Sequence, residues 1–287
     1  MSTRKPVFAG SWYPGKAAEC EKLIQEFLTD DRFKVQPDAG YKGGIVPHAG
    51  WVFSGSLACN VIAGLQGEAN TQKPDTIVIF GMHLPPNVSG YIMAEGAWET
   101  PFGDLMIDEA IARPIAKQFS LTEETAGRFT PDNTIELQLP FIKYFFPEAK
   151  LVPIGPPAAS TALEIGKKAA EAAESAGKTI KIIGSTDLTH YGPNFGFTPA
   201  GKGREAYTWV KDKNDRQVID AMLDMAPETV IKEGLSNHNA CCPGAAAAAI
   251  AAVKSLGAQK ARFVGYSSSY EHSPGDTFVG YGGVLFY

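Results

Sequence analysis

The chain has 287 residues, of which 44% are hydrophobic and 20% are charged, proportions that are typical of a globular protein. Its net charge of −5 and the lack of any Lys/Arg cluster argue against nucleic acid as the main partner. The longest apolar stretch, Ala245–Val253, is less than half as long as a membrane-spanning helix, so a membrane role is equally unsupported.

Two further features bear on the compartment. The opening MSTRKPVFAGSWYP lacks the apolar core of a signal peptide. The four cysteines, Cys20, Cys59, Cys241 and Cys242, fit neither a Cys-x-x-Cys pair nor a zinc ribbon. The sequence therefore predicts a reducing, cytoplasmic setting.

Apolar periodicity predicts alternating helices and strands along the chain. Helices are predicted over 16–29, 55–65, 108–119, 135–146, 161–176, 201–225, from Pro227 onward, and through the Ala-rich stretch after Pro243. Strands are predicted at 45–46, 76–80, 149–154, 179–184, 261–268 and 277–287, with an extended segment at 89–94. A polar linker covers 29–42, and residues 98–108 are expected to loop over the sheet and to dock Trp98 and Phe102. This alternation predicts an α/β fold, most simply as one domain over residues 1–287.

Details of two helices can also be predicted. Thr161 and Glu164 have the spacing of a capping box at the start of one helix, and Gly177 is the residue type expected just beyond its end. Pro227 is expected at the first position of another helix.

Histidines follow three of the predicted strands. His48 comes after the strand at 45–46, His83 after 76–80, and Asp187 with His190 after 179–184. A lone histidine is more often a hydrogen-bonded structural residue than a ligand. In an open parallel sheet, however, ligands bind at the carboxyl ends of the strands. We therefore expect these strand ends to converge on one metal-binding cleft.

Three residues are candidates for an anionic ligand beside the imidazoles: Cys242, Asp187 and Glu136. Cys242 directly precedes Pro243 and a predicted helix, where the helix dipole favours a thiolate. An equally good interpretation is that Cys241 and Cys242 are small core residues. Glu136 falls in the first turn of a predicted helix, where a surface carboxylate is the default.

Asp187 and His190 stand three residues apart in STDLTHYG. A carboxylate beside an imidazole can orient it or act with it in acid–base chemistry, although Asp187 could also be a simple helix cap. His238 and His272 are weaker candidates in loops. Because the Walker A, GxGxxG, HExxH and GxSxG motifs are missing from the sequence, nucleotide cofactors and a serine nucleophile are not expected.

Several motifs together resemble the Memo family, in prokaryotes the "AmmeMemoRadiSam system protein B" type, nearly from end to end. They are AGSWYP, VPHAGWVFSG, WETPFGD, TIELQLPF, STDLTHYG, HNACCPG and the closing VGYGGVLFY. The resemblance implies an αβα sandwich with a mostly parallel central sheet, similar to class III extradiol dioxygenases of the LigB type. It also implies iron or copper bound by His48, His83 and Cys242, with Asp187 and His190 beside the metal.

Two main functions are consistent with this resemblance. The first is a non-haem metal-dependent oxidoreductase in which Asp187 orients a neighbour and His190 carries a proton, acting on a small molecule in the cleft. The second is a non-catalytic protein that binds a peptide or a partner, working with radical SAM and AMMECR1-like components of the same system. A weaker third hypothesis is a hydrolase with Cys242 as nucleophile, paired with His190 or His238.

Overall fold

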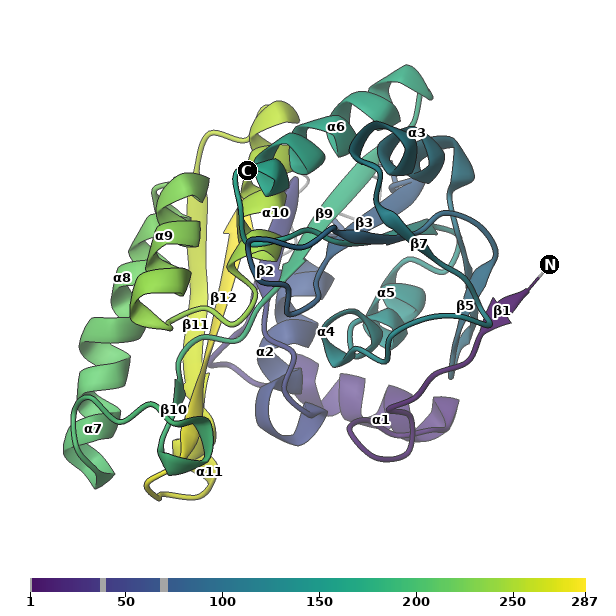
Figure 1. Ribbon diagram of the computed structural model, residues 1–287. Helices are drawn as coiled ribbons and strands as arrows, with labels where there is room; N and C mark the ends of the chain where they lie inside the picture. Colours follow the sequence, from purple (N-terminus) through teal and green to yellow (C-terminus); the bar gives the residue numbers. More distant parts are fainter. Residues whose placement is uncertain (1, 37–39, 68–71) are drawn as a thin grey trace.

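The computed structural model describes residues 2–36, 40–67 and 72–287, so positions 37–39 of the predicted linker lie outside the described part. A nine-stranded sheet crosses the molecule in the order β10-β12-β2-β9-β3-β8-β4-β7, with β11 paired to β12 (Figure 1). The strands are β2 (Gly43–Val46), β3 (Thr76–Phe80), β4 (Tyr91–Met93), β7 (Thr122–Glu124), β8 (Lys150–Gly155), β9 (Ile180–Ser185), β10 (His190–Tyr191), β11 (Ala261–Ser268) and β12 (Phe278–Phe286).

The centre of this sheet is parallel. Strands β2, β9, β3 and β8 run in the same direction, whereas β12 and β4 join them in antiparallel pairs and carry the margins of the sheet. The central strands are apolar and buried on both faces, as expected of a sheet covered by helices on both sides. Their carboxyl ends consequently meet at one edge of the layer.

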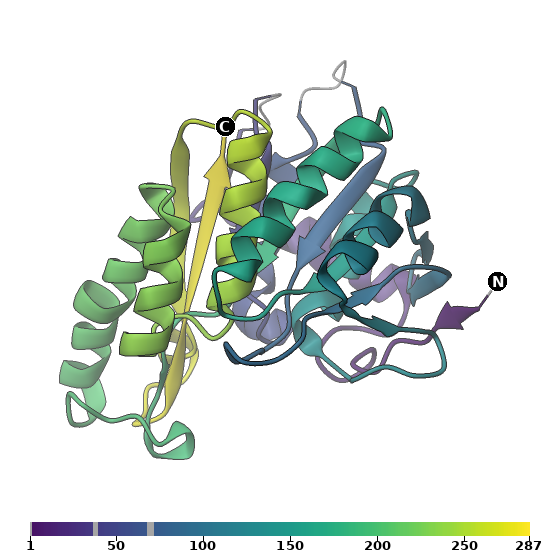
Figure 2. The same ribbon diagram turned by 45° about the horizontal axis from the view of Figure 1, so that its top comes forward.

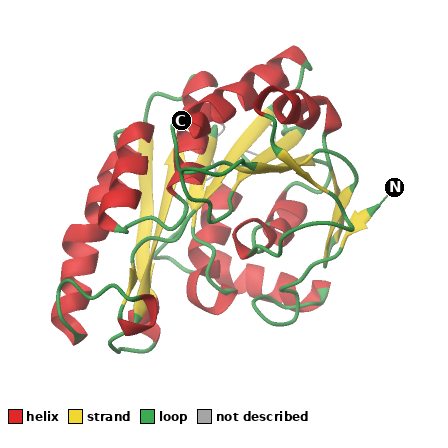
Figure 3. Cartoon of the chain, viewed as in Figure 1, coloured by secondary structure: helices red, strands yellow, loops and turns green. Residues whose placement is uncertain are grey.

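Helices cover both faces, which makes the fold an αβα sandwich (Figures 2 and 3). One face carries α3 (Glu109–Phe119), α6 (Thr161–Ser175), α8 (Asp215–Leu223), α9 (Pro227–Asn237) and α10 (Pro243–Ser255). The other carries α1 (Ala17–Leu28), α2 (Trp51–Gly64), α4 (Asn133–Glu136) and α5 (Leu139–Phe145). Two short helices, α7 (Gly203–Trp209) and α11 (Ser269–His272), lie near the end of the sheet where β10 runs.

Small residues allow α10 to sit deep in the structure. Its residues from Pro243 to Val253 are all buried, and it packs against α6 and β9. At Gly166 of α6, an added Cβ would lie 2.1 Å from the Ala248 carbonyl oxygen, so only glycine permits this approach. The predicted Ala-rich buried helix is confirmed, and its N-terminus is held firmly at the sheet edge.

The structure corrects several local predictions. Residues 98–108 do not form a loop: β5 (Ala97–Thr100) and β6 (Gly103–Met106) make a hairpin that pairs with β1 (Thr3–Arg4), although Trp98 is buried as expected. The predicted helix over 135–146 is two helices, α4 and α5. The one over 201–225 is interrupted by a π-helical turn at Val210–Asn214.

Helix termini show mixed outcomes. The helix predicted from residue 55 already begins at Trp51. The capping box at Thr161 is wrong, because Ser160 occupies the N-cap and no side chain caps α6. Gly177 does adopt the left-handed conformation after α6, with φ +65°, and Pro227 opens α9 as predicted. Within the described ranges, no helix has the length and apolar character that crossing a membrane demands.

Candidate metal centre

The residues of the candidate site come from three adjacent strand ends and one helix start. His48 follows β2, Asp187 follows β9 and His83 follows β3, and these strands are neighbours in the order β2-β9-β3. Cys241 and Cys242 directly precede α10, which packs on β9. The topology therefore brings together residues that are far apart in the sequence, as predicted from the strand-end histidines.

Four side chains can offer ligand atoms to one ion. The ligand atoms of His48, His83, Cys241 and Cys242 all lie within 4.8 Å of one another. Cys241 Sγ is 3.2 Å from His48 Nε2 and 3.7 Å from Cys242 Sγ. The rings of His48 and His83 meet edge to face with centroids 5.1 Å apart. The three predicted residues thus gather at one point, and Cys241, which sequence reasoning did not choose, lies among them.

The tautomer of His48 is set by a hydrogen-bond chain. Its Nδ1 lies 3.0 Å from Ser185 Oγ, and that hydroxyl donates its own proton to the Thr134 carbonyl at 2.7 Å. Ser185 can therefore only accept from Nδ1–H, which leaves Nε2, directed at Cys241, as the ring atom that can bind an ion once its own proton is lost. This is the tautomer that a metal-binding histidine needs, with the other ring nitrogen held by a neighbour.

Because Ser185 sets this tautomer, Ser185→Ala is expected to weaken ion binding by about 10- to 100-fold. The affinity would be measured by competition against a chromophoric chelator. Ser255→Ala is the matched control, since its hydroxyl donates to the Ala251 carbonyl within α10, away from the site. Equal affinity in both variants would show that the hydrogen bond to Nδ1 does not prepare His48.

His83 is presented by a strained turn. Met82 has φ +69°, a conformation that a non-glycine residue adopts at a cost, and its N–H donates to Thr134 Oγ1 at 2.6 Å. The turn directs the ring of His83 toward Asp132, whose Oδ2 lies 3.7 Å from Nδ1. Burial opposes protonation of His83, but Asp132 and the Cys241 thiolate outweigh it and raise its pKa to about 10.

The two cysteines differ in their surroundings. Cys241 is half-buried, and its sulfur accepts a hydrogen bond from the Asp187 backbone N–H at 3.2 Å. Although burial opposes ionisation, Cys242 and the histidines around it lower the pKa of Cys241 well below the usual thiol range. Burial and the Cys241 thiolate raise the pKa of Cys242. Without an ion, Cys241 is thus the thiolate of the pair.

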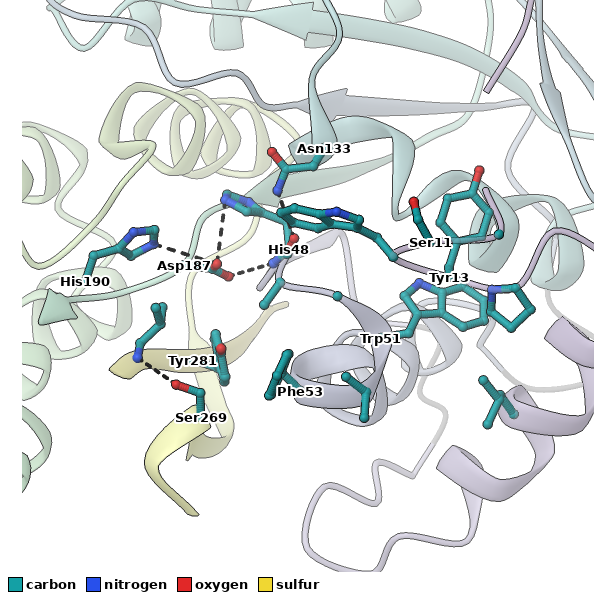
Figure 4. Close-up of a pocket in the computed structure, with 18 of the residues that line it drawn as sticks. Ser11, Tyr13, His48, Trp51, Phe53, Asn133, Asp187, His190, Ser269 and Tyr281 are labelled. Atoms are coloured by element: carbon teal, nitrogen blue, oxygen red, sulfur yellow. Dashed lines mark hydrogen bonds and ion pairs between the residues drawn. The ribbon is translucent and has the colours of Figure 1, made fainter. Parts of the chain in front are cut away.

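Asp187 lies between two histidines (Figure 4). Its Oδ1 accepts the His48 backbone N–H at 2.7 Å, while Oδ2 is 3.8 Å from His48 Nε2 and 3.9 Å from His190 Nε2. That nitrogen of His190 is buried and has no hydrogen-bond partner among the described residues. Burial opposes protonation of His190, but Asp187 and Cys241 raise its pKa to about 10. Asp187 is therefore placed to orient the His190 ring and to stabilise its protonated form.

Asp187→Asn is therefore expected to lower the His190 pKa in the ion-free protein, as measured by NMR titration of the ring. The raised pKa contributes stability that is fully present below the unfolded value of 6.5 and is lost as the pH rises through about 10. The substitution should consequently flatten the pH dependence of the unfolding free energy between about pH 6.5 and 10. An unchanged His190 titration would contradict this coupling.

Two cavities meet at this cluster. The larger, of about 840 Å³, is lined by His48, His83, Asp187 and His190 and by an aromatic wall. That wall consists of Trp12, Tyr13, Trp51, Phe53, Phe195 and Tyr281. The smaller, of about 560 Å³, lies on the side of α9 and shares His83 and His190 while adding Cys241 and His238. A small molecule in either cavity would reach His83 and His190.

The remaining predicted candidates have other places. Glu136 is not on the surface but fully buried, where its carboxylate accepts the N–H groups of Val7 and Phe8 at 2.6–2.9 Å, so it is not part of the cluster. His238 lines the smaller cavity with φ +51° at the end of α9. His272 contacts Phe53 edge to face, with ring centroids 5.7 Å apart.

The donor set fits a transition-metal ion. Imidazole and thiolate ligands suit copper, zinc and iron, and Nε2 of His48 lies beside the sulfurs of Cys241 and Cys242. Sequence reasoning missed Ser185 and Asp132, which position the two histidines, and did not choose Cys241. Ser185 ends β9 and is the first residue of the STDLTH motif. That position is the sequence signal that could have indicated its role.

The fold and this cluster define an α/β sandwich protein with a candidate metal centre at the carboxyl edge of its parallel strands. A family model described as "Memo-like protein" matches residues 4–285, and the chain belongs to this family. It is 32% identical to a "MEMO1 family protein" of Methanococcoides burtonii, with 98% of this chain and 99% of that protein covered. A "MEMO1 family protein" of Pyrobaculum arsenaticum is also 32% identical, with both chains covered completely.

The fold is also found in a solved structure of low sequence identity. It is a crystal structure of an uncharacterized protein from Escherichia coli K12, with a TM-score of 0.56 and 12% identity over 85% of this chain and 99% of that one. At this identity the likeness concerns the fold alone.

Proposed function

We propose that this Memo-like protein binds one transition-metal ion, iron or copper, through His48, His83 and Cys242, and acts as a non-haem metal-dependent oxidoreductase. The observation that carries the proposal is the convergence of four ligand atoms within 4.8 Å of one another, next to a cavity that His48 and His83 line. The larger cavity, of about 840 Å³, has room for a small organic molecule beside these ligand atoms. The four free thiols support a reducing, cytoplasmic setting.

The bound ion would supply electron transfer to or from a molecule in the cavity. The chain's own residues would do the rest. Ser185 holds His48 in the ligand tautomer, and Asp132 orients His83. Asp187 would keep His190 oriented, and His190, which lines both cavities, would take up or release the proton that accompanies the reaction. The aromatic wall would exclude water from the bound molecule.

Oxygen uptake by copper-loaded, desalted protein with ascorbate as reductant tests this function. His190→Gln should retain the ion but lower turnover by about 100-fold, the usual contribution of a proton-transferring residue. His272→Gln, at the exposed end of α11 and outside the lining of both cavities, should leave turnover unchanged. If the loaded wild-type protein shows no more uptake than ion-free protein, the oxidoreductase proposal fails while ion binding stands.

A second function, the binding of a peptide or partner protein, is favoured by the mouth of the larger cavity. Val52, Trp12 and Phe53 line that cavity and are 70%, 43% and 41% exposed, an unusual gathering of apolar side chains at a surface. The partners in this case would be components of a radical SAM system, including an AMMECR1-like protein. Ion-free protein that still binds such a component, with binding lost in Val52→Asp, would favour this function over catalysis.

A further inference from the structure

The sulfurs of both Cys241 and Cys242 lie within 4.8 Å of the ligand nitrogens of His48 and His83. The resemblance to the Memo family implied only one cysteine ligand, Cys242. The two sulfurs are 3.7 Å apart, much farther than the roughly 2.0 Å of a disulfide. Two metal–sulfur bonds of about 2.3 Å at a tetrahedral angle place the sulfurs about 3.8 Å apart. The observed separation therefore matches the one that a shared tetrahedral ion requires.

The histidines complete the same tetrahedron. A metal–sulfur and a metal–nitrogen bond at the tetrahedral angle place the two atoms about 3.5 Å apart, and Cys241 Sγ lies 3.2 Å from His48 Nε2. The widest pair of ligand atoms is within 4.8 Å, about 1 Å beyond a tetrahedral edge. His83, the most exposed of the four side chains, can close this difference by turning its ring, since its side chain is 43% exposed.

The neighbours of Cys241 also suit a ligand. Its sulfur accepts the backbone N–H of Asp187, a contact that stabilises a thiolate. Cys242, at the N-cap of α10, has its own backbone N–H bonded to Thr186 Oγ1 at 3.0 Å. Both cysteines are thus anchored through the 186–187 turn, which fixes the positions of two consecutive side chains that would otherwise diverge.

We propose that Cys241 is a fourth protein ligand, so that the ion is held by two sulfurs and two imidazole nitrogens in a closed tetrahedral centre. This inference rests on the proposed function, because it concerns the same ion. An S₂N₂ tetrahedron selects copper(I) or zinc over iron(II), which prefers more and harder ligands. Of the two metals named above, copper is therefore the one this chain is built to hold, and in the resting protein all four positions are filled.

Cobalt(II), which reports thiolate ligation through a near-ultraviolet charge-transfer band, provides the test. Anaerobic titration of the ion-free protein should give a band from two thiolates at one cobalt per chain. Cys241→Ser and Cys242→Ser should each lose about half of its intensity, and the double variant should lose all of it. Cys20→Ser, a buried cysteine that donates to the Pro14 carbonyl and lies outside the four-residue cluster, is the matched control and should keep the full band.

The outcomes separate the two proposals. A Cys241→Ser variant with the full wild-type band overturns the fourth ligand but leaves the ion centre intact. A wild-type protein that gives no band and binds no cobalt overturns the ion centre itself. X-ray absorption of the copper-loaded wild-type protein needs no variant: two sulfurs at about 2.3 Å support the proposal, and a single sulfur contradicts it.

Discussion

Replacement of His48 by alanine is expected to lower the affinity of the protein for its ion by more than about 100-fold, because loss of a ligand exceeds the loss of a residue that only orients one. His48 is buried, and its Nε2 points at Cys241 from the centre of the cluster. A water molecule could replace the imidazole, but it would not be held by the Ser185–Thr134 chain. Competition titration with a chromophoric chelator would measure the loss.

His272→Ala is the matched control for this result, because that residue ends α11, contacts Phe53 and lies outside the cluster. Cys242→Ser should weaken ion binding in the same direction as His48→Ala. If both variants hold as much ion as the wild-type protein, the residues named here are not its ligands and the oxidoreductase proposal loses its basis.

The second large effect concerns the wall of the larger cavity. Glu136→Ala is expected to lower the free energy of unfolding by about 2 to 3 kcal/mol, because it leaves the partly buried donors that the carboxylate satisfies without partners. These donors are the N–H groups of Val7 and Phe8 and the hydroxyl of Tyr13, 3.3 Å away. The segment they hold continues through Trp12, whose carbonyl accepts the Trp51 N–H. The same variant should therefore loosen the aromatic wall.

Urea denaturation measures this effect, and two variants control it. Glu136→Gln keeps one acceptor oxygen where the carboxylate Oε1 meets all three donors, so it should lose much less stability than the alanine variant. Glu123→Ala removes an exposed carboxylate and should change stability by no more than about 0.5 kcal/mol. Similar stability in Glu136→Ala and Glu123→Ala would contradict the anchoring role of Glu136.

The sequence predicted the parts of this fold that depend on local patterns. The apolar run Thr76–Phe80 forms the strand as predicted, and His83 follows it. His48 and Asp187 follow the neighbouring strands β2 and β9 in the same way. These features can be predicted because a buried parallel strand is a continuous apolar run, and the polar residue that follows it must lie at the sheet edge. Convergence of the three strand ends follows from the parallel order of β2, β9 and β3.

Other features of the site and the fold depend on tertiary packing and could not be predicted from local sequence patterns. Cys241 and Cys242 are consecutive, and which sulfur meets His48 depends on the backbone of Cys242, φ −127° and ψ 61°, just before α10. No local pattern encodes that angle. Glu136 looked like a surface residue at a helix start, but the N-terminal segment, more than a hundred residues earlier, covers it. The β5–β6 hairpin likewise depends on pairing with β1 at the far N-terminus.

Elemental analysis of the protein purified without air or chelators tests the central claim most directly. The geometry of His48, His83, Cys241 and Cys242 predicts about one transition-metal ion per chain in the wild-type protein and its loss in His48→Ala. A wild-type protein that carries no ion, and takes up neither copper(I) nor iron(II) when either is supplied, would contradict it.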